Sequence, residues 1–558
     1  MIKKSGVIFS WFLALCVSVF YLSFYSTHAN VIWYEQSATL YDLWAAQFGI
    51  SHIAFYALPR PGFLLDTLLV ILGVAPESLR TLTMFLTLLT SGILAFSLFK
   101  FILPKDSPRT YFFSFIFPWI VLLGIPSFNR PLDYESAPVI FICLSMVFFI
   151  HRNYFWPVFS ALFLSYATFS SLSALPAGLL VSMGMIFIFK DKEAKKIGYL
   201  SLIFILIFYG VYYGVEGVAW RVYNGISHVN NTGLSQHIPV FIIYGLELVL
   251  GLVLGLIFCY LLKDLKLYTC HLFLELSLVI LLGMIVFVSL FGGLGMIIDS
   301  LEILFFCLII SILFKLLDLS YESKKTLGFA LISGYLFLVF QHMFSGSYLI
   351  FVNYYSPFLL VVIGVLLGAL GRGGVFYRFN RMLCFCFLMI LALLHWNFFM
   401  SLNASNFQVI GPAWQNFSKN TEPSFIGVNV NKNLNYVYTN IQDAYDESDC
   451  KEKPVLVIAY PGLYFMFKRL APFDQIWLSR EVVIPDNSKI TDEVLIQWLA
   501  SQKSWCVFDA NTQPERVRKI RQNFLFPTRN YLARQSDTKQ DLGYAWIESS
   551  HFVLWVKE

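Results

Sequence analysis

Polar side chains gather in four stretches of this chain, each bounded by apolar runs, and the first three stretches contain acidic, basic or histidine residues. The stretches are residues 26–78, 128–135, 216–237 and 344–355. The side chains in these stretches that are best suited to catalysis or substrate binding are Glu35, Asp42, Arg60, Asp133, Arg221 and His228.

These residue types support a transfer reaction at a phosphate-bearing substrate. A carboxylate such as Glu35 or Asp42 can take a proton from an attacking hydroxyl. An arginine such as Arg60 can hold a phosphate through two parallel hydrogen bonds. Each residue alone is also what an ordinary solvated membrane interface displays. Brought to one face of a membrane, however, they would build a polar site just above the lipid.

The elements that must position these residues are apolar helices. The chain has 558 residues, of which 58% are hydrophobic and only 13% charged. Such low charge is atypical of a soluble domain, and apolar runs long enough to cross the bilayer recur through roughly the first 400 positions. We expect about thirteen spans, since helices satisfy their own backbone groups in lipid. They are 7–25, 79–99, 110–127, 134–151, 156–171, 173–190, 197–214, 238–262, 271–291, 300–318, 327–343, 349–371 and 383–401.

Lysine and arginine predict the orientation of these spans. With a cytoplasmic N-terminus, the inside segments hold roughly eighteen basic residues and the outside loops roughly four, a strong positive-inside bias. An odd number of spans then places the C-terminal end outside. All four polar stretches fall on the outer side. The formal net charge of +5 is small and says little about partners, and no nucleic-acid partner is expected.

The last part of the chain has a different composition. We predict an all-α polytopic membrane domain over 1–401 and a small extracytoplasmic α/β domain over 402–558, with strand-like runs at 455–459 and 505–508. Thr491 is placed to cap an amphipathic helix over 491–501. Cys450 and Cys506 are the two cysteines of this region. In an oxidising compartment they either pair or remain thiols, and the sequence leaves both open.

Motifs along the first 240 residues resemble, in their order, those of the C-type glycosyltransferases, nearest the bacterial lipid A aminoarabinose transferases and protein mannosyltransferase-like enzymes. The motifs are Trp33-Tyr34-Glu35 with Leu40-Tyr41, Pro59-Arg60-Pro61 with Leu64 to Gly73, Glu77 to Arg80, Pro131-Leu132-Asp133, and Trp220 to His228. The sequence departs from the family at three places. Tyr34 replaces the first acid of an Asp-Glu pair, Ser170 or Ser171 stands where a lysine is frequent, and Asn353-Tyr354 replaces Arg-Tyr.

The resemblance implies an inverting transfer of a sugar from a polyprenyl-phosphate donor to a lipid, glycan or protein acceptor. The reaction would take place at the outer face of a bacterial inner membrane. Glu35 is the expected base, with Asp42 its nearest competitor, and Arg60 and Arg221 would hold the donor phosphate. Asp133 and His228 would position substrate or hold a divalent metal ion, and whether an ion is needed stays open.

Two other functions compete with this one. A polysaccharide or lipid carrier without chemistry should place charges in mid-membrane, where Glu247 and Glu275 are the main candidates. A degenerate, inactive glycosyltransferase-like scaffold would use its C-terminal domain to bind a partner.

Overall fold

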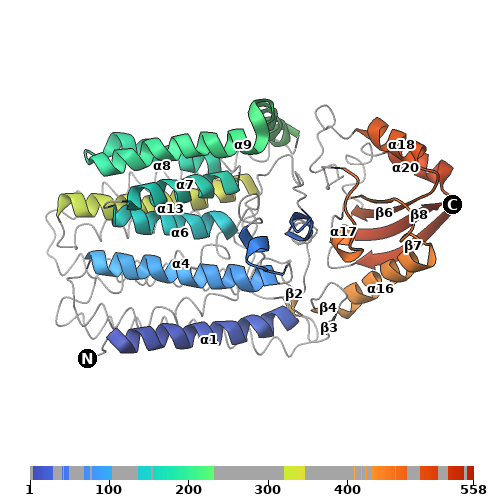
Figure 1. Ribbon diagram of the computed structural model, residues 1–558, viewed down its shortest axis with the longest axis horizontal. Helices are drawn as coiled ribbons and strands as arrows, with labels where there is room; N and C mark the ends of the chain where they lie inside the picture. The colour runs from blue at the N-terminus through green and yellow to red at the C-terminus, as the bar shows by residue number, and fades with distance from the viewer. Residues whose placement is uncertain are drawn as a thin grey trace.

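The computed structural model consists of a bundle of long helices and a small α/β domain that follows it in the chain (Figure 1). The residues that the structure describes are 4–28, 41, 43–48, 68–75, 78–102, 136–152, 155–171, 174–231, 320–345, 407–408, 416–417, 421–423, 429–458, 460, 462–473, 491–512, 526–545 and 550–558.

The described part of the bundle contains seven long helices. They are α1 (Lys4–His28), α4 (Leu79–Ile102), α6 (Ser136–Ile150), α7 (Trp156–Ser170), α8 (Leu175–Ile188), α9 (Lys192–Asn231) and α13 (Tyr321–Ser345). Each falls on one of the predicted spans. The remaining six predicted spans, and with them Glu247 and Glu275, lie outside the described residues. Helix α6 packs against α4, α7 and α13, and α9 packs against α7 and α8.

Two of the described helices contain a stretch long and apolar enough to cross a membrane, Phe85–Ile102 and Lys192–Val211. Shorter apolar helical stretches occupy Lys4–Val17, Ala137–Ile150 and Leu175–Ile188. The mostly helical architecture with a small sheet domain at its C-terminal end therefore agrees with the prediction in outline.

The predicted separation of residues 156–171 and 173–190 into two helices is confirmed. Helix α7 ends at Ser170, and Ser171 adopts an extended backbone. Helix α8 then begins with a proline in its first turn, a position where the missing N–H of proline costs nothing. The two helices pack closely, because a Cβ atom added to Gly178 of α8 would overlap the side chain of Thr168 of α7.

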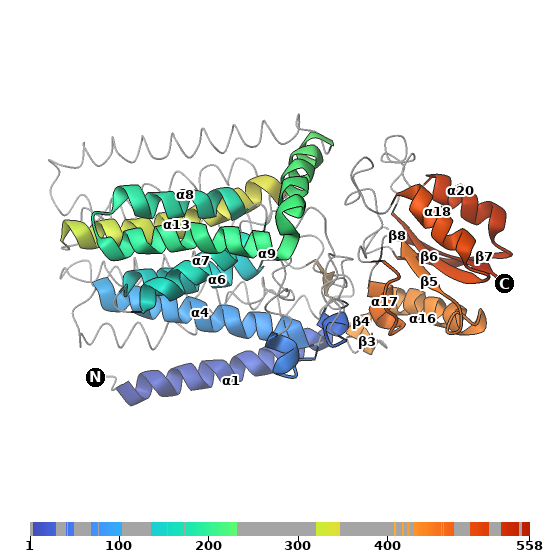
Figure 2. The same ribbon diagram turned by 45° about the horizontal axis from the view of Figure 1, so that its top comes forward.

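Helix α9 is much longer than predicted. Its 40 residues would measure about 60 Å if straight, about twice the hydrocarbon thickness. The prediction that residues 216–237 form a loop is therefore wrong up to Asn231. Polar residues at 216–231 ended the apolar pattern without ending the helix, since such residues are compatible with a helix that has left the lipid. Figure 2 shows α9 changing direction at the end of the bundle nearest the α/β domain.

Small polar residues inside the bundle satisfy one another across helices. The Oγ of Ser145 in α6 donates to the carbonyl of Ser160 in α7 at 2.9 Å, and Ser160 returns a bond to the carbonyl of Ser145 at 3.0 Å. Ser165 of α7 likewise donates to the carbonyl of Ser201 in α9 at 2.9 Å. Small side chains allow helices to approach closely and to hydrogen-bond in an apolar setting.

The C-terminal domain is built on a four-stranded sheet in the order β5-β6-β8-β7. The strands are β5 (Val455–Ile458), β6 (Trp505–Thr512), β7 (Thr538–Ala545) and β8 (Ser550–Lys557), with β5 and β6 parallel and the other pairs antiparallel. Helices α16 (Lys432–Glu447) and α17 (Gly462–Met466) cover one face, and α18 (Asp492–Ser501) and α20 (Phe526–Gln535) cover the other (Figure 1).

Alternation along β5 shows why both faces are covered. Val455 and Val457 join the core beneath α16 and α17, whereas Leu456 and Ile458 join the core beneath α18 and α20. Successive side chains of a strand point to opposite faces, so an entirely apolar strand needs a cover on each side. The predicted strands at 455–459 and 505–508 are thus confirmed as β5 and the first half of β6.

Two further local predictions are decided in this domain. Thr491 caps α18, with its side chain accepting a hydrogen bond from the N–H of Val494 at 3.3 Å. Cys450 and Cys506 form a disulfide, which joins the turn after α16 to β6. Short hairpins made by β1 (Phe407–Gln408) with β2 (Asn416–Phe417) and by β3 (Thr421–Pro423) with β4 (Asn429–Asn431) precede the domain.

Candidate functional site

The predicted site residues are distributed unevenly over the described structure. Glu35, Asp42, Arg60 and Asp133 lie outside the described residues. Arg221 and His228 belong to the last part of α9, where they are helical rather than in a loop. They are seven positions apart, about two helical turns, and so occupy one face of that helix.

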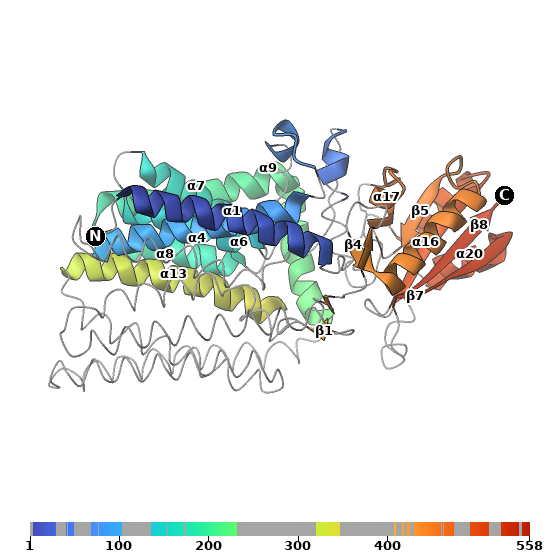
Figure 3. The same ribbon diagram turned by 90° about the horizontal axis from the view of Figure 1, so that it is seen from below.

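The end of the bundle next to the C-terminal domain collects the described parts of the predicted outer stretches. Helix α1 ends there in contact with β4, α4 begins there at Leu79, and α9 ends there (Figures 1 and 3). The segments 41–48 and 68–75 of the first predicted loop lie at the same end. The N-terminus lies at the opposite end of the bundle (Figure 1).

The opposite end carries a cluster of basic residues. Arg152, just after α6, forms an ion pair with Asp191 at 2.5 Å and donates to the hydroxyl of Thr326 near the start of α13. Although burial works against ionisation, hydrogen bonds from Arg152 and the backbone hold the pKa of Asp191 below its usual value. Lys325 lies over the ring of Phe189, which follows α8. This cluster joins four helix ends that the charge pattern predicts to be cytoplasmic.

The first predicted loop is packed into the core of the C-terminal domain. Tyr41 is fully buried, and its hydroxyl accepts a hydrogen bond from the N–H of Ala471 at 2.8 Å. Its ring lies 5.6 Å from the ring of Tyr464 in α17. Leu43 and Ala45 are also fully buried in this cluster. Residues more than 400 positions apart in sequence therefore share one hydrophobic core.

An aromatic and cationic contact lies beside Tyr41. The ring of Trp44 is 6.4 Å from that of Phe465 and 5.1 Å from that of Phe48. The ammonium of Lys468 lies 3.6 Å from the ring centroid of Phe465 and 5.9 Å from that of Trp44. A cation over an aromatic face is attracted by the ring quadrupole, so this contact adds to the attachment of the loop.

The second loop segment, 68–75, is a short helical turn with two unlike faces. Leu69 is buried in the cluster that contains Tyr41, whereas Leu68, Ile71 and Leu72 are largely exposed. Gly73 ends the turn with a φ of +68°, and the N–H of the following residue reaches back to the carbonyl of Leu69. Glycine adopts this left-handed conformation without a Cβ penalty. The turn therefore packs one apolar side chain into the cluster and leaves three apolar side chains exposed.

A divalent ion remains a prediction. Within the described ranges, no group of three or more His, Cys, Asp or Glu side chains is placed to hold a metal ion. Asp133, one of the two predicted ligands, lies outside those ranges. His228, the other predicted ligand, lies on α9.

The residues that hold the loop have no distinctive signal in the sequence. Tyr41 stands out in the sequence only as part of the Leu40-Tyr41 motif, and no sequence pattern points to Tyr464 or Ala471. The available signal was the amphipathic pattern of residues 38–48, which predicts an apolar face without naming what covers it.

Comparison with known proteins gives little further guidance. No protein-family model matches the chain, and no curated protein matches it. The structure of ArnT from Cupriavidus metallidurans bound to undecaprenyl phosphate aligns over 99% of this chain and 98% of that chain, with 9% sequence identity and a TM-score of 0.36. A TM-score this low does not establish a common fold.

Proposed function

We propose that this protein is a membrane glycosyltransferase that moves a sugar from a polyprenyl-phosphate donor to a lipid, glycan or protein acceptor. The observation that carries the proposal is the gathering of the first loop, the last part of α9 and the C-terminal domain at one end of the bundle. Those elements contain, or adjoin in sequence, the carboxylates and arginines that the reaction requires. Such an arrangement lets the lipid chain of the donor stay in the membrane while its sugar reaches the polar end.

The proposed reaction is a single displacement. The acceptor oxygen forms a bond to the anomeric carbon of the sugar as the bond from that carbon to the phosphate oxygen breaks. Glu35, or Asp42 in its place, takes the hydroxyl proton from the acceptor. The electron pair leaves with the polyprenyl phosphate, whose charge Arg60 and Arg221 stabilise. Because attack occurs opposite the leaving phosphate, the configuration at the anomeric carbon inverts.

The remaining two polar residues have supporting roles in this proposal. Asp133 and His228 hold the sugar or, if the enzyme uses one, a divalent ion that would neutralise phosphate charge. Asp133 shortly precedes the first residue of α6, and His228 lies near the last residue of α9.

We place the reaction at the outer face of a bacterial inner membrane, with the N-terminus in the cytoplasm. The basic cluster around Arg152 supports this orientation, because it lies at the end of the bundle opposite the proposed site. The disulfide between Cys450 and Cys506 also supports it, because disulfides persist in oxidising compartments outside the cytoplasm.

Transfer by the purified protein in lipid nanodiscs tests the proposal. Polyprenyl phosphates carrying radiolabelled sugars of several kinds serve as donors, and a membrane extract supplies acceptors. The wild type should transfer label, whereas Glu35→Gln, which keeps the shape of the side chain and removes the base, should lose at least about 100-fold in rate. Loss confined to Asp42→Asn would move the base to that residue.

The same assay separates the competing functions. Movement of the labelled lipid across the bilayer without transfer would identify a carrier. Neither movement nor transfer with any donor would indicate a scaffold. Full activity in both the Glu35 and the Asp42 variants would refute the proposed chemistry.

A further inference from the structure

We infer that Tyr41 is a positioning residue, which fixes the first loop and its proposed catalytic carboxylates against the C-terminal domain. This inference rests on the proposed function. It assigns to the C-terminal domain a direct part in the reaction, as the surface on which the catalytic loop is held. The participating residues are Tyr41 and Trp44 of the loop and Tyr464, Phe465 and Ala471 of the domain.

The contact between Tyr41 and the C-terminal domain is buried like a hydrophobic core. Tyr41 is among the largest fully buried side chains of the described structure, together with Trp505, Tyr438 and Tyr464. A buried tyrosine hydroxyl requires a partner, which the N–H of Ala471 supplies at 2.8 Å. The hydroxyl of the neighbouring Tyr464 is also held in place, because it accepts a hydrogen bond from the N–H of Val457 in β5 at 2.9 Å. Burial raises the pKa of Tyr464, so this hydroxyl stays protonated.

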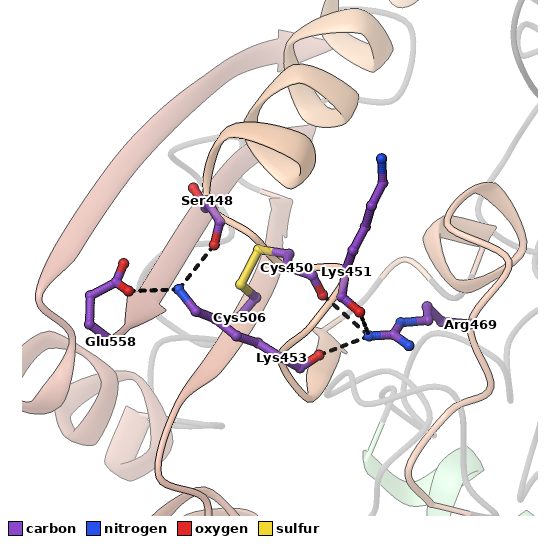
Figure 4. The surroundings of a disulfide bond; sticks show 7 residues. All are labelled: Ser448, Cys450, Lys451, Lys453, Arg469, Cys506 and Glu558. Carbon is purple, nitrogen blue, oxygen red and sulfur yellow. Dashed lines mark hydrogen bonds and ion pairs between the residues drawn. A yellow bond between two sulfur atoms is a disulfide. The ribbon is translucent and has the colours of Figure 1, made fainter.

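The backbone that receives Tyr41 is anchored to the disulfide. Figure 4 shows Arg469 reaching the turn that carries Cys450, where its guanidinium donates to three backbone carbonyls. The bonds to the carbonyls of Cys450 and Lys453 measure 3.4 and 3.0 Å, and the third goes to the carbonyl of Lys451. Ala471 follows Arg469 by two residues. A continuous set of bonds therefore runs from the sheet through the disulfide-linked turn to the hydroxyl of Tyr41.

Tyr41 is close in sequence to both proposed catalytic carboxylates. Asp42 is its immediate neighbour, and Glu35 precedes it by six residues. A general base must lie within hydrogen-bond reach of the proton that it removes. Misplacement of a reacting group by about 1 Å can cost roughly 100-fold in rate. Fixing Tyr41 therefore anchors the chain directly beside Asp42 and six residues after Glu35.

Tyr438 provides a matched control within the same core. It lies in α16, is 2% exposed and shares a 2.7 Å hydrogen bond between hydroxyls with Tyr460. Both of these tyrosines belong to the C-terminal domain. Replacing Tyr438 should thus weaken the core by an amount similar to the corresponding replacement of Tyr41 while leaving the attachment of the loop in place.

The experiment compares Tyr41→Ala, Tyr41→Phe, Tyr438→Ala and Tyr438→Phe in the full-length protein in nanodiscs. Sugar transfer gives kcat and KM, and amide hydrogen exchange of a peptide covering 43–48 reports loop docking without any substrate. Tyr41→Ala should lower kcat about 100-fold, more than it raises KM, because the carboxylates act on the chemical step. Tyr41→Phe keeps the ring, so it should retain most of kcat, and loss of one hydrogen bond should speed exchange roughly 5-fold. The Tyr438 variants should leave kcat and loop exchange unchanged.

Three results would overturn the inference. The first is faster loop exchange in Tyr41→Ala with kcat within twofold of the wild type. The second is an equal loss of kcat in the Tyr41 and Tyr438 variants, which would indicate general destabilisation. The third is an exchange rate of the 43–48 peptide that is the same in both Tyr41 variants as in the wild type, which would refute the docking itself. An inactive wild type with a protected loop would instead overturn the proposed function and, with it, the role in catalysis. If Tyr41→Ala fails to insert into the membrane, the exchange and kcat of Tyr41→Phe decide.

Discussion

Removing the disulfide of the C-terminal domain should destabilise that domain by several kcal/mol. The variant is the double substitution Cys450→Ala with Cys506→Ala, which removes both partners of the bond so that neither remains as an unpaired thiol. Both cysteines are fully buried, and the bond joins the turn after α16 to β6 at the centre of the sheet. The bond constrains the unfolded chain and also fixes the turn to which Arg469 is bound.

The magnitude follows from the length of chain that the bond closes. The cysteines are 56 residues apart, and the loop-entropy relation gives a loss of about 4 kcal/mol at 25 °C. Domains of this size have total stabilities of roughly 5–15 kcal/mol. The domain without the disulfide should therefore be marginal. Docking of the first loop should weaken as well, because the turn that binds Arg469 loses its link to β6.

Urea unfolding of the full-length protein in detergent micelles measures the effect. Trp505 and Trp555 make the fluorescence sensitive to unfolding of the domain, because both lie in the core beneath α18 and α20. Cys143→Ala is the control, since Cys143 is a free, buried cysteine of α6 in the bundle. It should leave the transition of the domain unchanged. A loss below about 1 kcal/mol in the double variant would refute the chain-entropy reasoning.

Two further predictions concern topology and donor binding. Cysteines introduced at Ser37 and Ser488 should react with a membrane-impermeant reagent in intact spheroplasts, because the charge pattern places both segments outside. Labelling only after lysis would overturn that topology. Arg60→Ala and Arg221→Ala should each weaken binding of a polyprenyl-phosphate sugar by roughly 10- to 100-fold, the range for hydrogen bonds to a charged group, whereas Arg372→Ala, on the predicted cytoplasmic side, should not. An equal loss at all three positions, measured by titration in nanodiscs, would count against the assignment.

Local patterns in the sequence were sufficient for the elements whose signals are local. Apolar runs predict the described helices of the bundle, and the run at 455–459 predicts β5. Thr491, placed before an amphipathic stretch, predicts the start of α18, because a side-chain oxygen at this position satisfies an otherwise unpaired N–H group. Ser170, Ser171 and Ser173 predict the break between α7 and α8.

The end of α9 shows where a local pattern is insufficient. The apolar run ends near residue 214, and the polar residues that follow predict a loop. Hydrophobicity reports the surroundings of a helix and not its hydrogen bonds, so a helix that leaves the lipid can continue without an apolar signal. As a result, Arg221 and His228 lie on one helix rather than in a flexible connection.

The sequence by itself determined the class of this protein and which residue types are available for chemistry near a membrane surface. Only the tertiary structure decided which distant parts support them: Cys450 pairs with Cys506, and the hydroxyl of Tyr41 accepts a hydrogen bond from the N–H of Ala471. The periodicity of a segment shows that it has an apolar face, but many apolar surfaces are compatible with that face. The choice among them depends on packing and on satisfying buried polar groups across the whole chain, as the hydroxyl of Tyr41 is satisfied by a backbone N–H that lies 430 residues away.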